Sequence, residues 1–356
     1  MSTTPKIKVL VVDDSAIVRK LLSQTLSAEP DIEVVGTAPD PYVARDKIVS
    51  LNPDVLTLDI EMPRMDGLTF LKKLMQARPM PVVIISSLGQ SSSRAALEAM
   101  QYGAVEVLAK PGGPYSVGDL KKDLPRKIRA ASRARIATAR ETPPAATTKP
   151  APARPMPALH PASRSDAVIL IGASTGGTEA IREVLCELPE NSPPIVIVQH
   201  IPAVFSRAFA DRLDGICRIR VKEAEDNDHL ARGLALVAPG NHHLLLRRNG
   251  DGYRVVLDDG PLVCYQRPSV DVLFHSAADF AGPNFTAAIL TGMGSDGARS
   301  MLELKRAGAH TIAQNEESCV VFGMPREAIQ LGAVDQVLPL NRIAGALLSG
   351  SLARAG

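Results

Sequence analysis

The sequence predicts an α/β protein made of two units, each built around a parallel β-sheet. Short apolar runs alternate with stretches of helical periodicity on both sides of a proline-rich segment at residues 141–165. Strands that alternate with helices form a parallel sheet, because each helix carries the chain back to the start of the next strand. The chain has 356 residues, which is long for one domain and suits two.

The N-terminal unit contains five strand–helix repeats. Between its apolar runs, hydrophobic residues recur with the spacing of a helix face, as at Val18, Leu21 and Leu22. Five such repeats imply a doubly wound, five-stranded sheet that helices cover on both faces. The predicted strands are residues 7–12, 32–37, 54–58, 81–85 and 104–108.

The C-terminal unit repeats this alternation and interrupts it once. Residues 242–259, "HHLLLRRNGDGYRVVLDD", contain two strand-like runs around an Asn-Gly-Asp-Gly turn, which is typical of a β-hairpin. We therefore predict a Rossmann-like α/β fold with an added hairpin. The other predicted strands are residues 167–171, 195–199, 234–238, 286–290, 309–313 and 334–338.

A linker separates the two units. Seven of the 25 residues from 141 to 165 are proline and the segment lacks hydrophobic periodicity, so we predict an extended connection. The basic residues 121–140 are interpreted as the solvated end of a last helix rather than as a nucleic-acid-binding arm. The predicted boundaries are a first domain at 6–130, a linker at 131–165 and a second domain at 166–350.

Composition argues against several classes of function. A formal net charge of +2 is too small to indicate binding to nucleic acid or to a membrane surface, and 3% aromatic residues without tryptophan argue against base stacking. Four scattered cysteines without a CxxC pair are typical of reduced thiols. The sequence has no signal-peptide core and no apolar run of about 18 residues. We expect a cytoplasmic protein without membrane insertion.

Charged and polar residues follow four strands of the N-terminal unit. Asp13 and Asp14 follow the first strand, and Asp59 ends the third. Ser87 and Lys110 follow the fourth and the fifth. Such strand ends meet at one edge of a parallel sheet, where three carboxylates suit Mg²⁺ and one can accept a phosphoryl group. The alternatives for single residues are a helix cap for Asp14 and an ordinary surface lysine for Lys110.

This unit resembles a response-regulator receiver domain, a family with a flavodoxin-like fold. The motifs "VDDS", "LDIEMPRMDG" and "AKP" stand at the positions and spacings of that family. The resemblance implies that a histidine kinase phosphorylates Asp59 and that Asp13, Asp14 and Asp59 hold Mg²⁺. It also implies that Ser87 and Lys110 contact the phosphoryl group.

One position departs from the receiver pattern. Many receivers carry an aromatic residue three positions before the lysine, whereas this chain has Val107. We therefore expect output through rearrangement around Ser87 rather than through an aromatic side chain that changes its rotamer.

The stretch "AVILIGASTGGTEAI" (167–181) leads from a predicted strand through a turn of small residues into a predicted helix. Its glycines could cradle a phosphate, but their spacing is not G-x-G-x-x-G. The end of the next strand, where a dinucleotide site needs a carboxylate for the ribose, holds His200. As G-x-S-x-G, the same stretch exposes Ser174 as a nucleophile. We favour the nucleophile and keep a receiver-controlled nucleotide-binding enzyme as the alternative.

Two later residues can complete a triad with Ser174, whose hydroxyl needs a base to take its proton. His200 follows the next strand, and Asp296 lies in the loop "TGMGSDG" after a buried strand. We expect these strand ends to converge, with Asp296 orienting the imidazole. The structural alternatives are a helix cap for Ser174, a core histidine for His200 and a turn residue for Asp296. Neither HExxH nor a Cys/His cluster occurs, so we expect no cofactor in this domain.

The C-terminal unit resembles the catalytic domain of the chemotaxis protein-glutamate methylesterases. "IGASTGG", "QHIP", "APGNHHL", "RPSVDVLF" and "TGMGSDG" occur in the order of that family. The resemblance implies hydrolysis of γ-glutamyl methyl esters on chemoreceptors, which releases methanol, and deamidation of particular receptor glutamines. It implies that Ser174 is the nucleophile, His200 the general base and then acid, and Asp296 its orienting residue. It further implies that the Met293 backbone N–H stabilises the oxyanion and that Thr175 supports the nucleophile.

Together the two resemblances imply a phosphorylation-regulated hydrolase in which the unphosphorylated receiver obstructs the active site. The implied partners are methyl-accepting chemoreceptors as substrate and a chemotaxis-type histidine kinase as phosphodonor; we expect no nucleic-acid partner and a monomer. A DNA-binding response regulator would carry a short helix-turn-helix module instead of about 185 residues of α/β pattern. A non-catalytic adaptor would be expected to lack a member of the Ser/His/Asp set.

Overall fold

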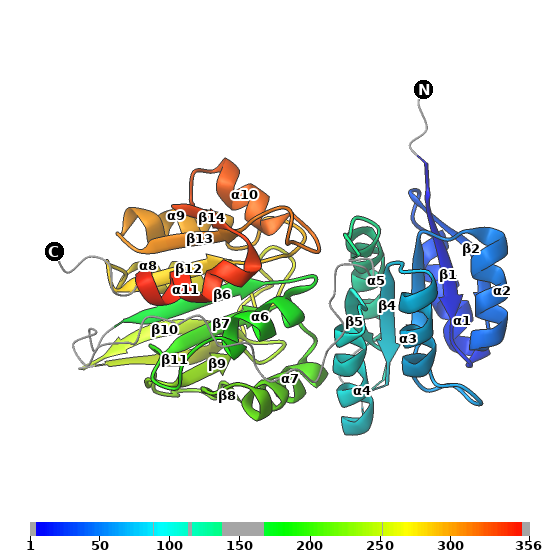
Figure 1. Ribbon diagram of the computed structural model, residues 1–356, viewed down its shortest axis with the longest axis horizontal. Coiled ribbons are helices and arrows are strands. Elements are labelled where there is room, and N and C mark those ends of the chain that lie inside the picture. Colours follow the sequence, from blue (N-terminus) through cyan, green and yellow to red (C-terminus); the bar gives the residue numbers. More distant parts are fainter. Residues whose placement is uncertain (1–4, 88, 113–115, 137–166, 251, 351–356) are drawn as a thin grey trace. The chain divides into compact units, whose positions relative to one another are not determined.

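The chain divides into two compact units at residues 146–147 (Figure 1). Each is an α/β unit with a parallel sheet, as predicted. Most of the predicted linker lies outside the described residues, and the predicted domain boundaries therefore stay predictions. This computed structural model describes residues 5–87, 89–112, 116–136, 167–250 and 252–350.

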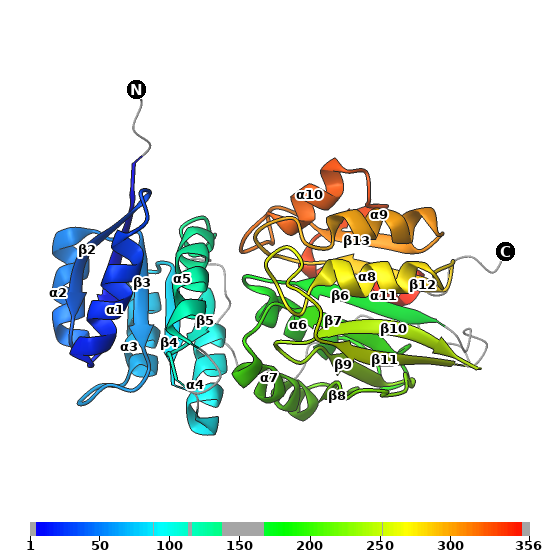
Figure 2. The same cartoon turned by 180° about the vertical axis from the view of Figure 1, so that it is seen from behind.

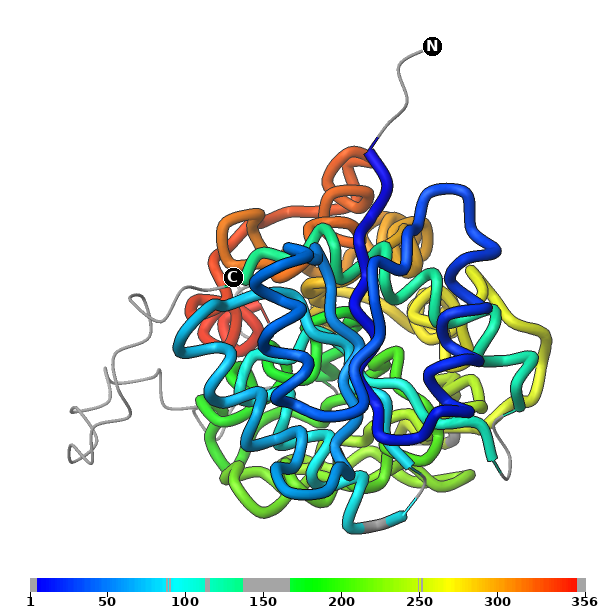
Figure 3. Tube along the Cα trace, turned by 90° about the vertical axis from the view of Figure 1, so that its right-hand side faces the viewer, coloured from blue at the N-terminus to red at the C-terminus, as the bar shows by residue number. Residues whose placement is uncertain are grey.

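Strands and helices alternate through the described part of the first unit, and Figure 3 shows its Cα trace. Its strands are β1 (Ile7–Val12), β2 (Ile32–Ala38), β3 (Val55–Asp59), β4 (Val82–Ser86) and β5 (Glu106–Ala109). Its helices are α1 (Ala16–Ser27), α2 (Pro41–Leu51), α3 (Gly67–Ala77), α4 (Gln90–Gln101) and α5 (Val117–Ala131). The strand order β2-β1-β3-β4-β5 is that of a flavodoxin-like sheet, which confirms the predicted fold.

The strands of this unit are apolar because helices cover both faces of the sheet. All residues of β3 and β4 are buried. Polar N-caps start four of the helices: the side chains of Ser15, Asp40, Asp66 and Ser116 accept hydrogen bonds from backbone N–H groups of the first turn. The caps of α1, α2 and α3 fix where the loops after β1, β2 and β3 end.

The second unit has a seven-stranded parallel sheet and a separate hairpin. Its strands are β6 (Val168–Ala173), β7 (Ile195–Gln199), β8 (Arg220–Glu223), β9 (Leu234–Val237), β10 (His243–Asn249), β11 (Gly252–Asp258), β12 (Phe285–Ile289), β13 (His310–Gln314) and β14 (Gln336–Leu338). Its helices are α6 (Gly177–Cys186), α7 (Ala203–Ile216), α8 (Val270–Ala278), α9 (Ala298–Arg306), α10 (Met324–Gln330) and α11 (Leu340–Gly350). The sheet order is β14-β13-β12-β6-β7-β9-β8.

Strand β8 is absent from the strands predicted from the sequence. It lies at the sheet edge beside β9, and three of its four residues are charged. An edge strand needs few apolar side chains, so hydrophobic periodicity gives no signal for it. The other strands of the sheet and the hairpin β10–β11 are confirmed, the hairpin with antiparallel register from His243–Asp258 to Asn249–Gly252.

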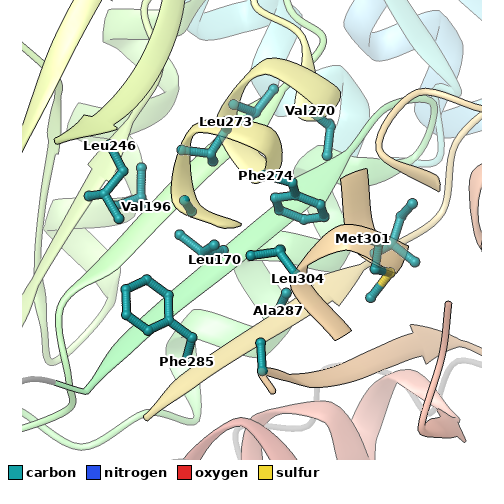
Figure 4. Packing of buried hydrophobic residues seen from close by; sticks show 14 of the residues in the cluster. Leu170, Val196, Leu246, Val270, Leu273, Phe274, Phe285, Ala287, Met301 and Leu304 are labelled. Atoms are coloured by element: carbon teal, nitrogen blue, oxygen red, sulfur yellow. The ribbon is translucent and has the colours of Figure 1, made fainter. Parts of the chain in front are cut away.

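Helices cover both faces of the second sheet. Helices α6 and α11 pack together on one face (Figure 1), and α8, α9 and the hairpin lie on the other (Figure 2). Figure 4 shows the core on the latter face, in which Leu273 and Phe274 of α8 share one cluster with Leu246 of the hairpin and with Leu170 and Ala287 of the sheet. No helix in the described ranges is long and apolar enough to cross a membrane.

Each sheet has a switch point at which the strand order reverses direction. It lies between β1 and β3 in the first sheet and between β6 and β12 in the second. In open α/β sheets the loops after such strands diverge to opposite faces, and ligands bind at this carboxyl edge. Asp13 follows β1 and Asp59 ends β3, whereas Ser174 follows β6 and Asp296 lies after β12.

The core around α8 gives a direct test of packing. Phe274 is fully buried, and we expect Phe274→Ala to lower the free energy of unfolding of the second unit by about 3–5 kcal/mol because it leaves a cavity. Denaturant unfolding followed by circular dichroism measures the loss. Tyr265 is 77% exposed, so we expect Tyr265→Ala to change this free energy by less than about 0.5 kcal/mol. Equal losses in both variants would contradict this assignment of the core.

Candidate active site

Ser174, His200 and Asp296 leave three strands at one edge of the second sheet. β6 pairs with β7 so that Ala173 lies beside Gln199, and Ser174 and His200 are the next residues of each chain segment. The His200 N–H donates to the Ala173 carbonyl at 3.1 Å. The Ser174 N–H donates to the carbonyl of Thr291, which follows β12, at 3.0 Å. The three loops are therefore joined by backbone hydrogen bonds.

The turn after Ser174 depends on two glycines. Gly176 has φ +77°, a left-handed conformation that favours glycine, and it is the N-cap of α6. A Cβ on Gly177 would lie 2.1 Å from Oε1 of Gln199. Because the N-cap position belongs to Gly176 and has no side-chain hydrogen bond, the alternative that Ser174 caps this helix is wrong.

The His200 imidazole is bound to Asp296. Nε2 of His200 lies 2.7 Å from Oδ2 of Asp296, and both residues are at least 95% buried. Asp296 also accepts hydrogen bonds from the Ser269 hydroxyl at 2.7 Å and from the backbone N–H groups of Val270 and Asp271 at 2.8 and 3.0 Å. The last two belong to the first turn of α8, whose dipole favours a negative charge at this point.

These donors decide the protonation of Asp296. Burial alone would raise the pKa of the carboxyl, but the hydrogen bond and charge of His200, with the donors at the start of α8, hold that pKa below its usual value. Asp296 is therefore a carboxylate, so Nε2 of His200 carries a hydrogen and Nδ1 is the ring nitrogen with a free lone pair. Among the described residues, the buried Nδ1 has no hydrogen-bond partner, and no hydrogen bond joins Ser174 to His200.

A glycine loop packs against Ser174. A Cβ on Gly292 would lie 2.7 Å from Cβ of Ser174 and 2.4 Å from Sδ of Met324. Met293 is the next residue of this loop. Thr175 is buried, and its carbonyl accepts a hydrogen bond from the Thr291 hydroxyl at 2.9 Å, which ties the turn after Ser174 to the loop after β12.

Sequence reasoning missed two residues that hold this arrangement. The Gln199 side-chain amide donates to the carbonyls of Ser174 at 2.9 Å and of His200 at 3.3 Å. Ser269 caps α8 and donates to Asp296. A cap could have been predicted from a serine before an apolar helix, but its contact with Asp296, 27 positions away, depends on tertiary packing.

In the first unit, Lys110 lies between two carboxylates. Its Nζ is 3.0 Å from Oδ2 of Asp13 and 2.8 Å from Oδ2 of Asp59. Its side chain is 17% exposed, so the alternative of an ordinary surface lysine is wrong. Ser15, and not Asp14, is the N-cap of α1, so the cap alternative for Asp14 is wrong as well.

Burial dominates the ionisation of this cluster. It raises the pKa of Asp59 to about 6, with the hydrogen bond from Lys110 opposing the shift and the charge of Asp13 adding to it. Burial also raises the pKa of Asp13, against the charge of Lys110. One ammonium group therefore pairs with two buried carboxylates, so a further positive charge in this cluster would be electrostatically favourable.

Oxygen atoms of Asp13, Asp14 and Asp59 lie within 4.8 Å of one another and can hold a divalent cation. Cys264, Asp271 and Asp296 are equally close, but the oxygens of Asp296 already accept four hydrogen bonds. The first set suits a hard cation such as Mg²⁺, because all its ligands are carboxylate oxygens.

In the described part of the chain, Ser87 makes no hydrogen bond to the Asp59 carboxylate. Its hydroxyl donates to Oε2 of Glu61 at 2.7 Å, and the hydroxyl of Ser92 donates to the other oxygen of Glu61. The Glu61 N–H in turn donates to Oδ1 of Asp59 at 3.2 Å. Glu61 was not singled out from the sequence, since an acidic residue in a surface loop carries no signal of its own. Val107 is buried in β5.

Known proteins resemble both units. A CheB methylesterase family model matches residues 169–347, and a response regulator receiver domain model matches residues 9–119. A protein-glutamate methylesterase/protein-glutamine glutaminase of Syntrophus aciditrophicus is 58% identical over 95% of this chain and 97% of its own length. This chain belongs to the CheB methylesterase family.

Other members of the CheB methylesterase family are comparably similar. A Burkholderia lata protein of the same description is 54% identical over 96% of this chain and 94% of its own. The crystal structure of the Thermotoga maritima CheB methylesterase catalytic domain matches with a TM-score of 0.51 and 39% identity, and it covers 52% of this chain and 99% of that domain. This CheB-family chain therefore combines a receiver domain with the catalytic domain of a hydrolase family, as its motifs predicted.

The nucleotide-binding alternative finds no support in this geometry. A dinucleotide site would need a ribose-binding carboxylate at the end of β7. That position holds His200, whose imidazole is hydrogen-bonded to Asp296.

The contact between Gly292 and Ser174 predicts a steric effect. In Gly292→Ala the new methyl group would meet Met324 and Ser174, so we expect the free energy of unfolding to fall by about 1–3 kcal/mol. The matched control is Gly345→Ala in α11, where nothing lies within 4 Å of the added Cβ and alanine favours the helix. Chemical denaturation of both variants measures the difference. A Gly292→Ala protein as stable as the control would contradict the close approach.

Proposed function

We propose that this protein hydrolyses γ-glutamyl methyl esters on chemoreceptors, with release of methanol, and deamidates particular receptor glutamines to glutamates. Ester and primary amide are both acyl-transfer substrates, so one nucleophile serves both reactions. We assign the nucleophile to Ser174, the general base to His200 and the orienting carboxylate to Asp296. The single observation that carries this assignment is the buried His200–Asp296 hydrogen bond at the strand end beside Ser174.

The first half of the reaction acylates Ser174. Its Oγ attacks the carbonyl carbon of the ester while Nδ1 of His200 takes the hydroxyl proton, and Asp296 stabilises the resulting imidazolium through Nε2. The backbone N–H of Met293 stabilises the oxyanion of the tetrahedral intermediate, and Thr175 supports the turn that holds Ser174. Collapse of the intermediate breaks the C–O bond, and His200 gives its proton to the leaving methoxide, which departs as methanol.

The second half restores the enzyme. A water molecule attacks the acyl-enzyme carbonyl while Nδ1 of His200 takes one of its protons, and Ser174 leaves with that proton. The product is a glutamate side chain. With a glutamine substrate the first leaving group is ammonia, and the remaining steps are the same.

The base in this mechanism is Nδ1, whereas Nε2 is the base in the familiar Ser-His-Asp template. The difference follows from which ring nitrogen Asp296 occupies: its contact with Nε2 leaves Nδ1 as the acceptor. The backbone adjacency of Ser174 and His200 supports a short rotation of the serine side chain as the step that completes the proton relay.

Removal of the nucleophile tests the assignment. We expect Ser174→Ala to lower methanol release from methylated receptor membranes by about 10⁴-fold or more, because no hydroxyl remains to be acylated. Ser349→Ala is the matched control: its exposed hydroxyl in α11 donates to the carbonyl of Ala346, far from Ser174 in the chain, and we expect full activity. Methanol release within tenfold of wild type in the Ser174→Ala protein would reject Ser174 as the nucleophile.

We further propose that phosphorylation of Asp59 by a histidine kinase raises this activity. The carboxylates of Asp13, Asp14 and Asp59 would hold Mg²⁺, which when bound neutralises negative charge on the phosphoryl group. Lys110 already lies within contact of Asp59 and would pair with the added charge. Ser87 would leave Glu61 to contact a phosphoryl oxygen, and this exchange of partners is the local rearrangement that carries the signal.

Loss of the phosphorylation site tests the regulation. We expect Asp59→Ala to keep the basal methanol release and to lose the increase that a small-molecule phosphodonor causes in wild type, because no carboxylate accepts the phosphoryl group. Asp46→Ala removes an exposed carboxylate of α2 instead and should respond like wild type. A full response in the Asp59→Ala protein would contradict control through this residue.

We propose that the protein works as a monomer in the cytoplasm, where the methylated segments of chemoreceptors and their kinase are found. Its partners are then the chemoreceptor, as substrate, and the kinase, as phosphodonor.

A further inference from the structure

Two cysteines of the second unit lie in contact at the ends of neighbouring helices. Cys186 is the last residue of α6, and Cys217 is the C-cap of α7. Their Sγ atoms are 3.6 Å apart although the residues are 31 positions apart in sequence. Both are free thiols, and both are half-buried, so small reagents reach them. We propose that Cys186 and Cys217 form a reversible disulfide when the protein meets a peroxide, and that this bond locks α6 to α7.

The geometry allows the bond with small movements. A disulfide has an S–S distance of about 2.05 Å, so the two sulfurs must approach by about 1.5 Å. Helices α6 and α7 already pack together, and each cysteine stands at a helix end, where the backbone adjusts more readily than in the middle. The other described cysteines are not part of this pair: Cys264 is exposed in a loop and Cys319 is buried.

The surroundings of the pair indicate the order of events. Burial raises the pKa of the Cys217 thiol to about 12, the neighbouring Cys186 adds to the rise, and Arg182 opposes it. Cys217 is therefore protonated at neutral pH and a poor first target, since the thiolate is the reactive form. The first step is therefore placed at the other member of the pair, Cys186: its thiol loses a proton and attacks hydrogen peroxide, the O–O bond breaks, and a sulfenic acid and water form.

The second step closes the disulfide. Burial is the main cause of the raised pKa of Cys217, and with Cys186 as a neutral sulfenic acid no thiolate forms beside Cys217 to add to the rise. Cys217 loses its proton and attacks the Cys186 sulfur, the S–O bond breaks, and the hydroxide leaves as water. In total, two thiols and one hydrogen peroxide give one disulfide and two waters. A dithiol reverses the reaction by thiol–disulfide exchange.

The position of the pair suggests what the bond does. Helix α6 begins directly after the Ser174 turn, and α7 begins three residues after His200, but both cysteines lie at the far ends of these helices. Along α6 the separation from Gly177 is about 14 Å. We therefore infer that the disulfide restrains the two helices at the ends far from Ser174 and His200, as a redox-controlled brace of the catalytic domain. Disulfides of this kind in reducing compartments are usually transient.

Peptide mapping of the full-length protein tests the bond. The protein is treated with hydrogen peroxide, blocked with iodoacetamide, digested without reduction and analysed by mass spectrometry, with a dithiothreitol-treated half as reference. We expect a linked pair of peptides containing Cys186 and Cys217 that dithiothreitol separates. In Cys264→Ser the same link should form. If Cys186 and Cys217 stay unlinked while Cys264 is oxidised, the proposal is overturned.

Two further readouts separate the mechanism from accidental oxidation. In Cys217→Ser the sulfenic acid has no resolving thiol, so we expect Cys186 to be trapped by dimedone. In the full-length wild-type protein, oxidation should also raise the midpoint of thermal unfolding of the catalytic domain by about 5–10 °C. A rise of this size is expected for the loop that the bond would close between Cys186 and Cys217. No rise in wild type, or an equal rise in Cys217→Ser, would contradict the brace.

Discussion

The buried carboxylate of Asp296 is the constraint that organises the catalytic domain. An isolated charge in the interior costs several kcal/mol, and it is tolerated only when donors replace the water that it has lost. Here the donors come from His200, from Ser269 and from the first turn of α8. The carboxylate thus ties the end of β7, the loop after β12 and the start of α8 to one point, and the orientation of the imidazole follows from it.

The buried carboxylates of the two domains are stabilised by different electrostatic interactions. Both domains bury carboxylates at the switch point of a parallel sheet, because the strands all end at the same edge and the loops diverge there. Asp296 receives four hydrogen bonds and its pKa is lowered. Asp59 and Asp13 share one ammonium, and burial raises the pKa of both. The first arrangement fixes a charge in place, whereas the second leaves a deficit of positive charge that suits a metal ion and a phosphoryl group.

Glycines allow the loops around Ser174 in the catalytic domain to approach one another closely. Gly176 supplies a left-handed turn after Ser174. Gly292 lets the loop after β12 lie so close to the Ser174 side chain that any Cβ at this position would clash with it. The hydrogen bonds from Gln199 to the carbonyls of Ser174 and His200 then hold the two neighbouring turns together. Backbone geometry, more than side-chain contact, brings the Ser174 turn and the His200 imidazole to adjacent positions.

The sequence by itself determined the alternation of strands and helices, the hairpin and the placement of polar residues at strand ends, because hydrophobic periodicity and glycine turns are local properties. It also carried the motifs of both families. It did not reveal the edge strand β8, which has no apolar period, or the contacts of Ser269 and Glu61. Which imidazole nitrogen faces Asp296 was decided only by the tertiary structure, since that choice depends on how α8 packs beside β6 and β7. Contacts between residues far apart in the chain are set by packing, and no local pattern encodes them.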